Sequence, residues 1–225
     1  MVIDAFVKSF NEEDKDKCVS MAINAIENDK IDIPFLYEKV LRELLYSIDE
    51  CTTEDCIWRE HRKTSIIRTV IECMYPYVMK LKNETKKLNK KVVLICPEKE
   101  YHEIGLRMVD DFLQINGYET IFIGTNTPKD QVLKAMLSIR PDYLAISVTD
   151  YYLLFEAQKI IQTVKENTNN VKIIVGGRAF KDNYDSIKII GGDFYLETYE
   201  DIIKLRAGDK NEIIFWYSPE IFKVW

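Results

Sequence analysis

The sequence lacks the signatures of several common classes of protein. Its five cysteines are scattered, and no two of them form a Cys-x-x-Cys pair, which argues against a disulfide framework or a zinc site. No stretch of eighteen apolar residues occurs, and the N-terminus has no basic segment followed by a long apolar one. We therefore expect neither a membrane span nor a secretion signal, and a reduced, cytoplasmic setting fits best.

The chain also has fewer basic than acidic residues, and it has few histidines. The formal net charge is −6, so the chain has no general attraction for nucleic acid or for anionic membranes, and we expect it to bind neither directly. It contains two histidines and no Ser-x-x-Lys, Gly-x-Ser-x-Gly, His-Glu-x-x-His or P-loop sequence. Hydrolytic chemistry would have few candidate bases, so we predict no catalytic residues and do not expect the chain to be an enzyme on its own.

The first part of the chain has a helical pattern. From residue 2 to about residue 81, apolar residues recur at spacings of three and four. Breaks at residues 28–30, at Ile33-Pro34 and at residues 50–55, where Thr52 or Thr53 could cap the next helix, divide this part into four helices. The lysine-rich residues 80–91 fit a helix end and a linker, with a phosphate-binding strip as the alternative. We predict a helical bundle domain over residues 1–85.

The remainder, residues 91–225, has a different period. Short β-branched runs alternate with amphipathic segments, and this alternation predicts a Rossmann-like (flavodoxin-like) parallel sheet of five strands, covered on both faces. The fold class is therefore α/β, with an N-terminal four-helix bundle cap. The expected strands are residues 92–96, 120–124, 143–148, 171–177 and 193–196, and the expected helices are residues 104–115, 129–139, 153–164 and 180–190. Ligands of such sheets bind beyond the carboxyl ends of the strands.

A histidine follows the first predicted strand at the position where ligands of such sheets bind. The imidazole of His102 is a good ligand for cobalt or iron. Glu100, two residues earlier, could accept the proton of the other ring nitrogen, and Gly105 would let a ligand approach closely. From composition alone, a surface or helix-capping histidine explains His102 equally well.

The loops taken together resemble a known family. The pattern Glu-x-His-x-x-Gly, then Ser147-Val148-Thr149 after the third strand and Gly176-Gly177 after the fourth, resembles the cobalamin-binding domains of methionine synthase, B12-dependent mutases and corrinoid methyl carriers, over about residues 91–205. The resemblance implies an adenosyl- or methylcobalamin cofactor held between cap and sheet domain. His102 would replace the dimethylbenzimidazole base as the lower ligand of cobalt, with Glu100 as its hydrogen-bond partner. The nucleotide tail would lie among Gly105, Ser147, Thr149, Gly176 and Gly177.

Two residues depart from that family's pattern. Glu100 stands where the family has aspartate, which lengthens the reach to the imidazole. Thr149 stands where leucine is common, and its hydroxyl needs a partner. The Glu-x-His form is similar to that of MerR-type light-responsive cobalamin repressors, whose sensory region also consists of a helical cap followed by this domain.

A second resemblance lies in the helical part. Residues 58–64, which include Trp58, Glu60 and His61, resemble the Glu-His-x-x-Thr cap helix of those photoreceptors and of methionine synthase. This implies that these three residues face the corrin from above, although adjacent Glu60 and His61 cannot both do so squarely. An exposed amphipathic helix is the alternative. The photoreceptors' cap tryptophan and the histidine that follows it in some members correspond to Glu50 and Cys51, so the upper ligand and any light response stay open.

These resemblances support three functions. The first is a sensory or regulatory corrinoid protein whose output passes through a protein partner or through homo-oligomerisation. The second is a methyl carrier that serves separate methyltransferases. The third is a haem or other tetrapyrrole sensor, since imidazole ligates iron equally well. The aromatic extension at residues 213–225 is expected to pack a last strand onto the domain, with ligand stacking or a dimer contact as alternatives.

Overall fold

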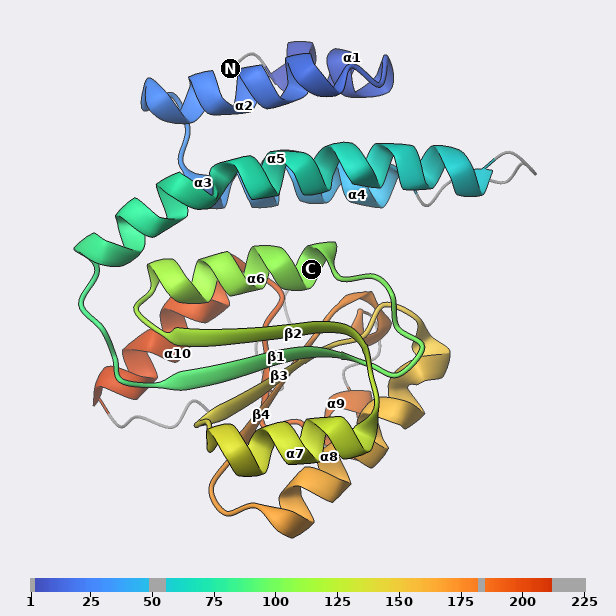
Figure 1. The fold of residues 1–225 in the computed structure, drawn as a ribbon, viewed down its shortest axis with the longest axis vertical. Coiled ribbons are helices and arrows are strands. Elements are labelled where there is room, and N and C mark those ends of the chain that lie inside the picture. The colour runs from blue at the N-terminus through green and yellow to red at the C-terminus, as the bar shows by residue number, and fades with distance from the viewer. Residues whose placement is uncertain (1–2, 49–55, 182–184, 212–225) are drawn as a thin grey trace, which may run out of the picture. The chain divides into compact units, whose positions relative to one another are not determined.

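The fold is described by a computed structural model for residues 3–48, 56–181 and 185–211 (Figure 1). The chain divides into two compact units. Residues 1–85 together with residues 104–115 make up the helical unit, and residues 86–103 together with residues 116–225 make up the sheet unit. The helix over residues 104–115, which the sequence places between the first two strands, thus groups with the helical unit.

The helical unit has a break at residues 12–14 that the apolar spacing does not predict, and otherwise contains the predicted helices. They are α1 (Ile3–Asn11), α2 (Lys15–Glu27), a continuous run of α3 (Ile33–Phe35), η1 (Leu36–Leu41) and α4 (Arg42–Ile48), then α5 (Cys56–Glu84) and α6 (Ile104–Ile115). Pro34 lies in the first turn of α3, and the side chain of Asp32 caps that turn by accepting a 2.8 Å hydrogen bond from the Phe35 amide. The predicted break and threonine cap at residues 50–55 lie outside the described residues.

The long helix α5 provides much of the core of this unit. Its buried residues recur at spacings of three and four, so they form one apolar stripe. They are Ile66, Ile67, Val70, Ile71, Met74 and Val78. The helix packs against α2 and α6 (Figure 1). At its N-terminal part, Arg62 forms a 2.8 Å ion pair with Glu13 in the turn between α1 and α2.

The sheet unit has the predicted parallel sheet. Its strands are β1 (Lys91–Pro97), β2 (Glu119–Thr127), β3 (Tyr143–Ser147), β4 (Lys172–Gly176) and β5 (Phe194–Tyr195). They are all parallel and lie in the order β2-β1-β3-β4-β5. This flavodoxin-like order confirms the predicted fold class. The direction of strand addition reverses between β1 and β3, so the loops after these two strands border one crevice.

Helices cover the sheet on both faces (Figure 1). The helices of this unit are α7 (Lys129–Ile139), η2 (Tyr151–Leu153), α8 (Leu154–Asn167), η3 (Arg178–Phe180), α9 (Asp185–Ile190) and α10 (Tyr199–Asn211). Apolar residues of β1, β3 and β4, such as Val93, Ile146 and Val175, form one buried core with Met136 of α7 and Ile160 of α8. Helix α10 lies on the opposite face of the sheet (Figure 1).

Two lysines of residues 80–91 contact residues that are distant in the chain. Lys82 donates a 2.8 Å hydrogen bond to Gln114, and Lys90 forms a 3.1 Å ion pair with Asp142. Such contacts agree with a helix end and a linker. No helix among the described residues reaches the length and apolar character that crossing a bilayer demands. The aromatic residues 213–225 lie outside the described residues.

Candidate functional site

The loop after β1 is held by the end of β2. Glu100 donates its amide hydrogen to the Pro97 carbonyl at 3.0 Å, which closes a tight turn. Within that turn, Lys99 has a left-handed φ of 70° and donates its amide to Oδ1 of Asn126 at 2.8 Å. The Asn126 amide donates to the Glu100 carbonyl at 2.9 Å. Asn126 thus fixes the backbone that carries Glu100, a role that nothing in its sequence context predicts.

Glu100 and His102 form a close pair at the carboxyl end of β1. Nδ1 of His102 lies 2.6 Å from Oε1 of Glu100, and the His102 amide donates to the same oxygen at 3.0 Å. The Glu100 side chain is 1% exposed, whereas the His102 side chain is 59% exposed. A carboxylate only accepts hydrogen bonds, so the hydrogen of a neutral imidazole sits on Nδ1 and the lone pair sits on Nε2.

The second oxygen of Glu100 reaches the loop after β3. Oε2 accepts hydrogen bonds from the backbone amides of Thr149 and Asp150, at 2.8 and 3.1 Å. Burial raises the pKa of Glu100, but the hydrogen bonds from the His102 ring, the His102 amide and these two amides outweigh burial and lower the pKa to about 2. The longer side chain that departs from the family's aspartate therefore spans from the imidazole to the β3 loop.

The residues predicted after β3 and β4 lie next to one another. Ser147, which is buried, pairs in register with Gly176. A Cβ atom on Gly177 would lie 2.3 Å from the Val148 carbonyl oxygen, and Gly177 has a φ of 101°, which disfavours other residues. A Cβ atom on Gly176 would lie 2.8 Å from the Leu196 carbonyl oxygen. The glycine pair is therefore required by the close approach of backbone segments within the sheet unit.

Gly105 has no such packing requirement. It is the second residue of α6 and is exposed, and a Cβ atom built on it would meet no atom within 4 Å. The protein's own packing would accept a side chain at this position. Packing within the protein therefore gives no reason for a glycine at this position.

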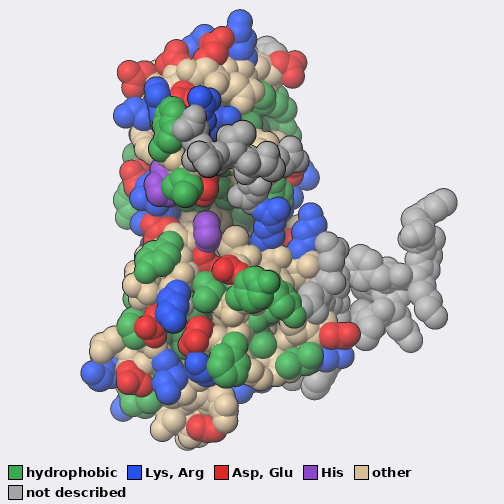
Figure 2. Space-filling view, turned by 90° about the vertical axis from the view of Figure 1, so that its right-hand side faces the viewer, with side chains coloured by type: hydrophobic (Ala, Val, Ile, Leu, Met, Phe, Trp, Pro, Cys, Tyr) green, Lys and Arg blue, Asp and Glu red, His purple; other side chains and the backbone are tan. Residues whose placement is uncertain are grey.

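The cap residues lie near the start of α5 in the helical unit. Trp58 is 51% exposed with the Arg59 guanidinium 5.0 Å from its ring centre, and Glu60 is partly buried. Trp58 and His61 are three residues apart and therefore lie on one side of the helix. Figure 2 shows both histidines of the chain as exposed surface. Glu50 and Cys51, which replace the photoreceptors' tryptophan and histidine, lie outside the described residues.

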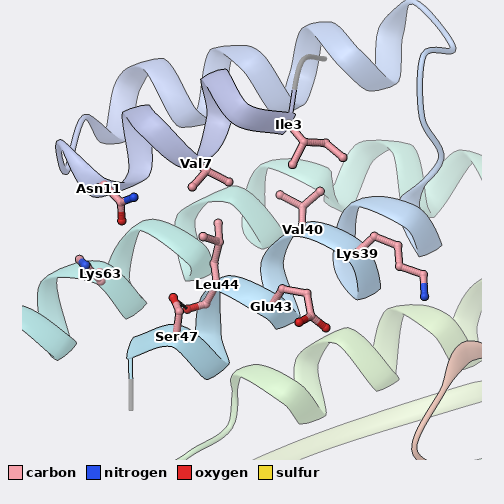
Figure 3. Close-up of a pocket in the computed structure, with 9 residues that line it drawn as sticks. All are labelled: Ile3, Val7, Asn11, Lys39, Val40, Glu43, Leu44, Ser47 and Lys63. Atoms are coloured by element: carbon pink, nitrogen blue, oxygen red, sulfur yellow. Dashed lines mark hydrogen bonds between the residues drawn. The ribbon is translucent and has the colours of Figure 1, made fainter. Parts of the chain in front are cut away.

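A separate cavity of about 410 Å³ lies within the helical unit (Figure 3). Its apolar lining comes from Ile3, Val7, Val40 and Leu44, and Lys39 and Lys63 are among its polar residues. None of the predicted site residues lines it. In the part of the chain that the structure describes, no three His, Cys, Asp or Glu side chains are grouped so that they could hold a metal ion.

The sequence of the sheet unit matches a known family. Residues 90–207 match the B12 binding domain, which is more than half of the chain, and the chain therefore belongs to the B12-binding domain family. This confirms the resemblance seen in the strand-end motifs of the sequence.

Two curated proteins illustrate the relationship. The chain is 23% identical over 138 residues to the HTH-type transcriptional repressor CarA of Myxococcus xanthus, covering 61% of this chain and 44% of the repressor. It is 28% identical over 113 residues to trimethylamine corrinoid protein 1 of Methanosarcina acetivorans, covering 49% of this chain and 52% of that protein. The chain spans about half the length of these relatives.

Solved structures share the fold over most of the chain. The monomethylamine corrinoid protein of Methanosarcina barkeri aligns with a TM-score of 0.76 at 16% identity, covering 89% of this chain and 94% of that protein. A chain of the methanol:cobalamin methyltransferase complex of the same organism aligns with a TM-score of 0.52 at 21% identity, covering 96% of this chain and 85% of that chain. These likenesses establish the architecture of a helical part followed by a Rossmann-like domain.

Proposed function

We propose that the protein binds a cobalamin-type corrinoid in the base-off/His-on form, with Nε2 of His102 as the lower ligand of cobalt. The observation that carries the proposal is the 2.6 Å contact between Nδ1 of His102 and the carboxylate of Glu100. It fixes the tautomer in which Nε2 bears the lone pair, and it raises the basicity of the ring as a metal ligand.

The surroundings of His102 fit a macrocyclic metal complex. One imidazole nitrogen supplies a single ligand, so a metal ion bound to it needs further ligands, and a corrin ring brings its in-plane nitrogens with it. The imidazole side chain is 59% exposed, which leaves it accessible to a large cofactor. Gly105 presents open space where a side chain would otherwise stand. The corrinoid supplies cobalt–carbon chemistry when bound, and the chain's residues set its axial ligation.

The tail of the corrinoid would occupy the crevice between the loops after β1 and β3. Parallel sheets bind ligands where the strand order reverses, and Ser147 at the end of β3 and Thr149 in the loop after it stand on the β3 side of that point. Gly176 and Gly177 act indirectly in this proposal, because they let the β3 and β4 loops approach closely enough to shape the crevice. On the helical unit, Trp58, Glu60 and His61 are proposed to face the other side of the corrin.

The test is a visible spectrum of the purified protein mixed in the dark with hydroxo-, methyl- or adenosylcobalamin. We expect stoichiometric binding and a base-off/His-on spectrum that His102→Ala abolishes. His61→Ala removes the other histidine of the chain; because His61 is proposed to face the upper side of the corrin, this variant can change binding there, but it should keep the base-off/His-on features, which report the lower ligand. A spectrum that depends on His61 and not on His102 would contradict the assignment. Binding of haem with an iron–imidazole spectrum would replace the corrinoid with the tetrapyrrole alternative.

Two roles for the bound corrinoid each have a specific observation in their favour. A sensory or regulatory role is supported by the Glu-x-His form of the motif and by the similarity to a transcriptional repressor. Methyl carriage between separate methyltransferases is supported by the similarity to a trimethylamine corrinoid protein and by the fold shared with a monomethylamine corrinoid protein.

The chemistry of the loaded protein separates these roles. A carrier accepts a methyl group in its cob(I) form from a methyl donor and a methyltransferase, and its oligomeric state is indifferent to the upper ligand. A sensor changes its oligomeric state or its affinity for a partner when the upper ligand is lost, in light or by exchange. Reduction to cob(I) followed by remethylation, together with size-exclusion chromatography of each ligation state, assigns the role.

A further inference from the structure

A buried polar pair lies in the helical unit, apart from the candidate corrinoid site. The hydroxyl of Tyr37, in η1, donates a 2.7 Å hydrogen bond to Oδ2 of Asp111, in α6. Tyr37 is 0% exposed and Asp111 is 7% exposed. The two residues are 74 positions apart in the chain, so their contact joins two helices rather than stabilising one turn. Nothing in the proposed binding of a corrinoid uses them.

The position of the pair links it to the segment that carries His102. Helix α6 begins at Ile104, two residues after His102, and its second residue is Gly105. Its contacts in the helical unit include the Tyr37–Asp111 hydrogen bond, the Lys82–Gln114 hydrogen bond and packing on α5. The loop with His102 therefore has one end in the sheet unit and continues directly into a helix of the helical unit.

Tyr37 lies in a segment of unusual backbone geometry. Residues 36–41 form a π-helical turn inside an otherwise α-helical run. Such turns are rare, and they are frequent at functional sites. The ring of Tyr37 packs on Phe112 with 5.6 Å between ring centres, and Leu36, Val40 and Leu113 are buried in the same unit. Asp111 is thus a buried carboxyl group next to the Tyr37–Phe112 ring contact, where its charged form is costly and a hydrogen bond from a neutral hydroxyl offsets only part of that cost.

We infer that the buried Tyr37–Asp111 contact is a proton-sensitive joint: the packing of α6 on η1 is more stable when Asp111 carries a proton than when it is ionised, because burying the carboxylate costs more than the Tyr37 hydrogen bond returns. A buried carboxylate costs free energy that a buried carboxylic acid does not. Loss of the proton therefore weakens the attachment of the helix that follows the His102 loop. The effect on the corrinoid site rests on the proposed function. The pH-dependent packing of α6 on η1 does not depend on whether a corrinoid binds.

The charged groups around Asp111 agree with proton uptake near neutrality. The pKa of Asp111 is raised to about 7, chiefly by burial; the Tyr37 hydrogen bond and attraction to Arg107 lower the pKa, and repulsion from Asp110 raises it, but burial outweighs the lowering effects. On α5, Lys82 is bonded to Gln114.

On the η1 side, Glu38 pairs with Arg42 at 3.7 Å. The folded-state pKa of Asp111 exceeds its ordinary value of 3.8. The contribution of protonated Asp111 to the stability of the fold is therefore complete below about pH 4 and is lost as the pH rises through about 7.

Thermal unfolding of the full-length, ligand-free protein between pH 5.5 and 8.5 tests the joint. Asp111→Asn keeps the shape of the side chain and an acceptor for the Tyr37 hydroxyl but cannot ionise. We expect the Tm of the wild type to fall by about 5 °C more than that of Asp111→Asn over this range. The comparison removes the effects of the ionisable groups that the two proteins share. Parallel curves for the two proteins would overturn the inference.

Two further variants sharpen the result. Tyr37→Phe keeps the ring on Phe112 and removes the donor that favours the ionised form, so the midpoint of the fall in Tm should move to higher pH. Asp29→Asn, an exposed aspartate of the same unit with a φ of 50° that asparagine tolerates, is the matched control and should follow the wild-type curve. A midpoint that Tyr37→Phe leaves in place would assign the pH effect to another group.

The link to the corrinoid site has its own measurement. Affinity for hydroxocobalamin is compared at pH 6.0 and 8.0 for the wild type and Asp111→Asn. We expect the affinity at pH 6.0 divided by the affinity at pH 8.0 to be about threefold larger for the wild type than for Asp111→Asn. Equal ratios would show that the joint does not reach the site. If neither protein binds the cobalamin, the proposed function fails, and the unfolding curves of the ligand-free protein still decide whether the joint exists.

Discussion

Nδ1 of His102 and Oε1 of Glu100 lie 2.6 Å apart, while the other oxygen of the same carboxylate holds the amides of Thr149 and Asp150. One buried side chain therefore joins the candidate metal ligand to a loop that is 49 residues away in the chain. Aspartate, one methylene shorter, has less reach to make both contacts. The glutamate that departs from the family's pattern thus contacts both the candidate metal ligand and the β3 loop.

Replacing Glu100 tests this link. We expect Glu100→Gln to weaken binding of hydroxocobalamin by about 10- to 100-fold, because an uncharged partner raises the basicity of the imidazole less. Glu100→Asp should also weaken binding, because it cannot reach both the imidazole and the β3 loop. Isothermal titration gives the affinities. Glu98→Gln, on the exposed part of the same loop, is the control, and an equal loss in this variant would argue against a specific role for Glu100.

Glu100 should also shape the acid stability of the ligand-free protein. Its folded-state pKa of about 2 lies below its ordinary value of 4.5, so it stabilises the fold above pH 4.5 and loses that effect as the pH falls through about 2. The contribution is on the order of 2 kcal/mol. Urea unfolding at pH 5 and pH 3 should show a smaller loss of stability for Glu100→Gln than for the wild type. An equal loss would mean that other carboxyl groups account for the acid sensitivity.

Two glycines are predicted to behave in opposite ways when alanine replaces them. Gly177→Ala should lower the free energy of unfolding by at least about 2 kcal/mol, because the new Cβ would meet the Val148 carbonyl and the backbone is left-handed. Gly105→Ala should leave stability unchanged or raise it by up to about 1 kcal/mol, because alanine favours helices.

Cobalamin binding tests Gly105 separately from its effect on stability. Gly105→Ala is expected to weaken cobalamin binding while the protein remains fully folded, because the methyl group fills the open space beside the second residue of α6. Chemical unfolding and cobalamin titration of the same preparations give both quantities. Unchanged binding in Gly105→Ala would remove this glycine from the proposed site.

Trp58 allows a separate test of the helical unit. Because the ring is half exposed, Trp58→Ala should change the free energy of unfolding by no more than about 0.5 kcal/mol. If the ring faces the corrin, the same variant binds methylcobalamin severalfold more weakly and with a changed spectrum. Trp58→Phe, which retains an aromatic ring, should recover part of the affinity. Wild-type binding in Trp58→Ala would favour the alternative of an exposed amphipathic helix.

Much of the fold could be predicted because it depends on short-range patterns. Alternating β-branched runs and amphipathic segments predicted the order of elements from β1 to β5, and the predicted helices over residues 104–115 and 129–139 agree with α6 and α7. Helix α10 was not predicted. Boundaries were less accurate where tertiary contacts decide them. Strand β2 extends to Thr127, three residues past its predicted end, because it continues along β1 through shifts in register.

The sequence by itself determined the parallel fold, its order of elements and the family, because apolar period and strand-end motifs are local and recur in fixed places. It also placed Glu100 beside His102, since two residues in one turn cannot lie far apart. Only the tertiary structure decided that Glu100 bonds the amides of Thr149 and Asp150, and that Tyr37 meets Asp111. Those contacts join residues dozens of positions apart, and they depend on strand order and helix packing, which no local pattern encodes.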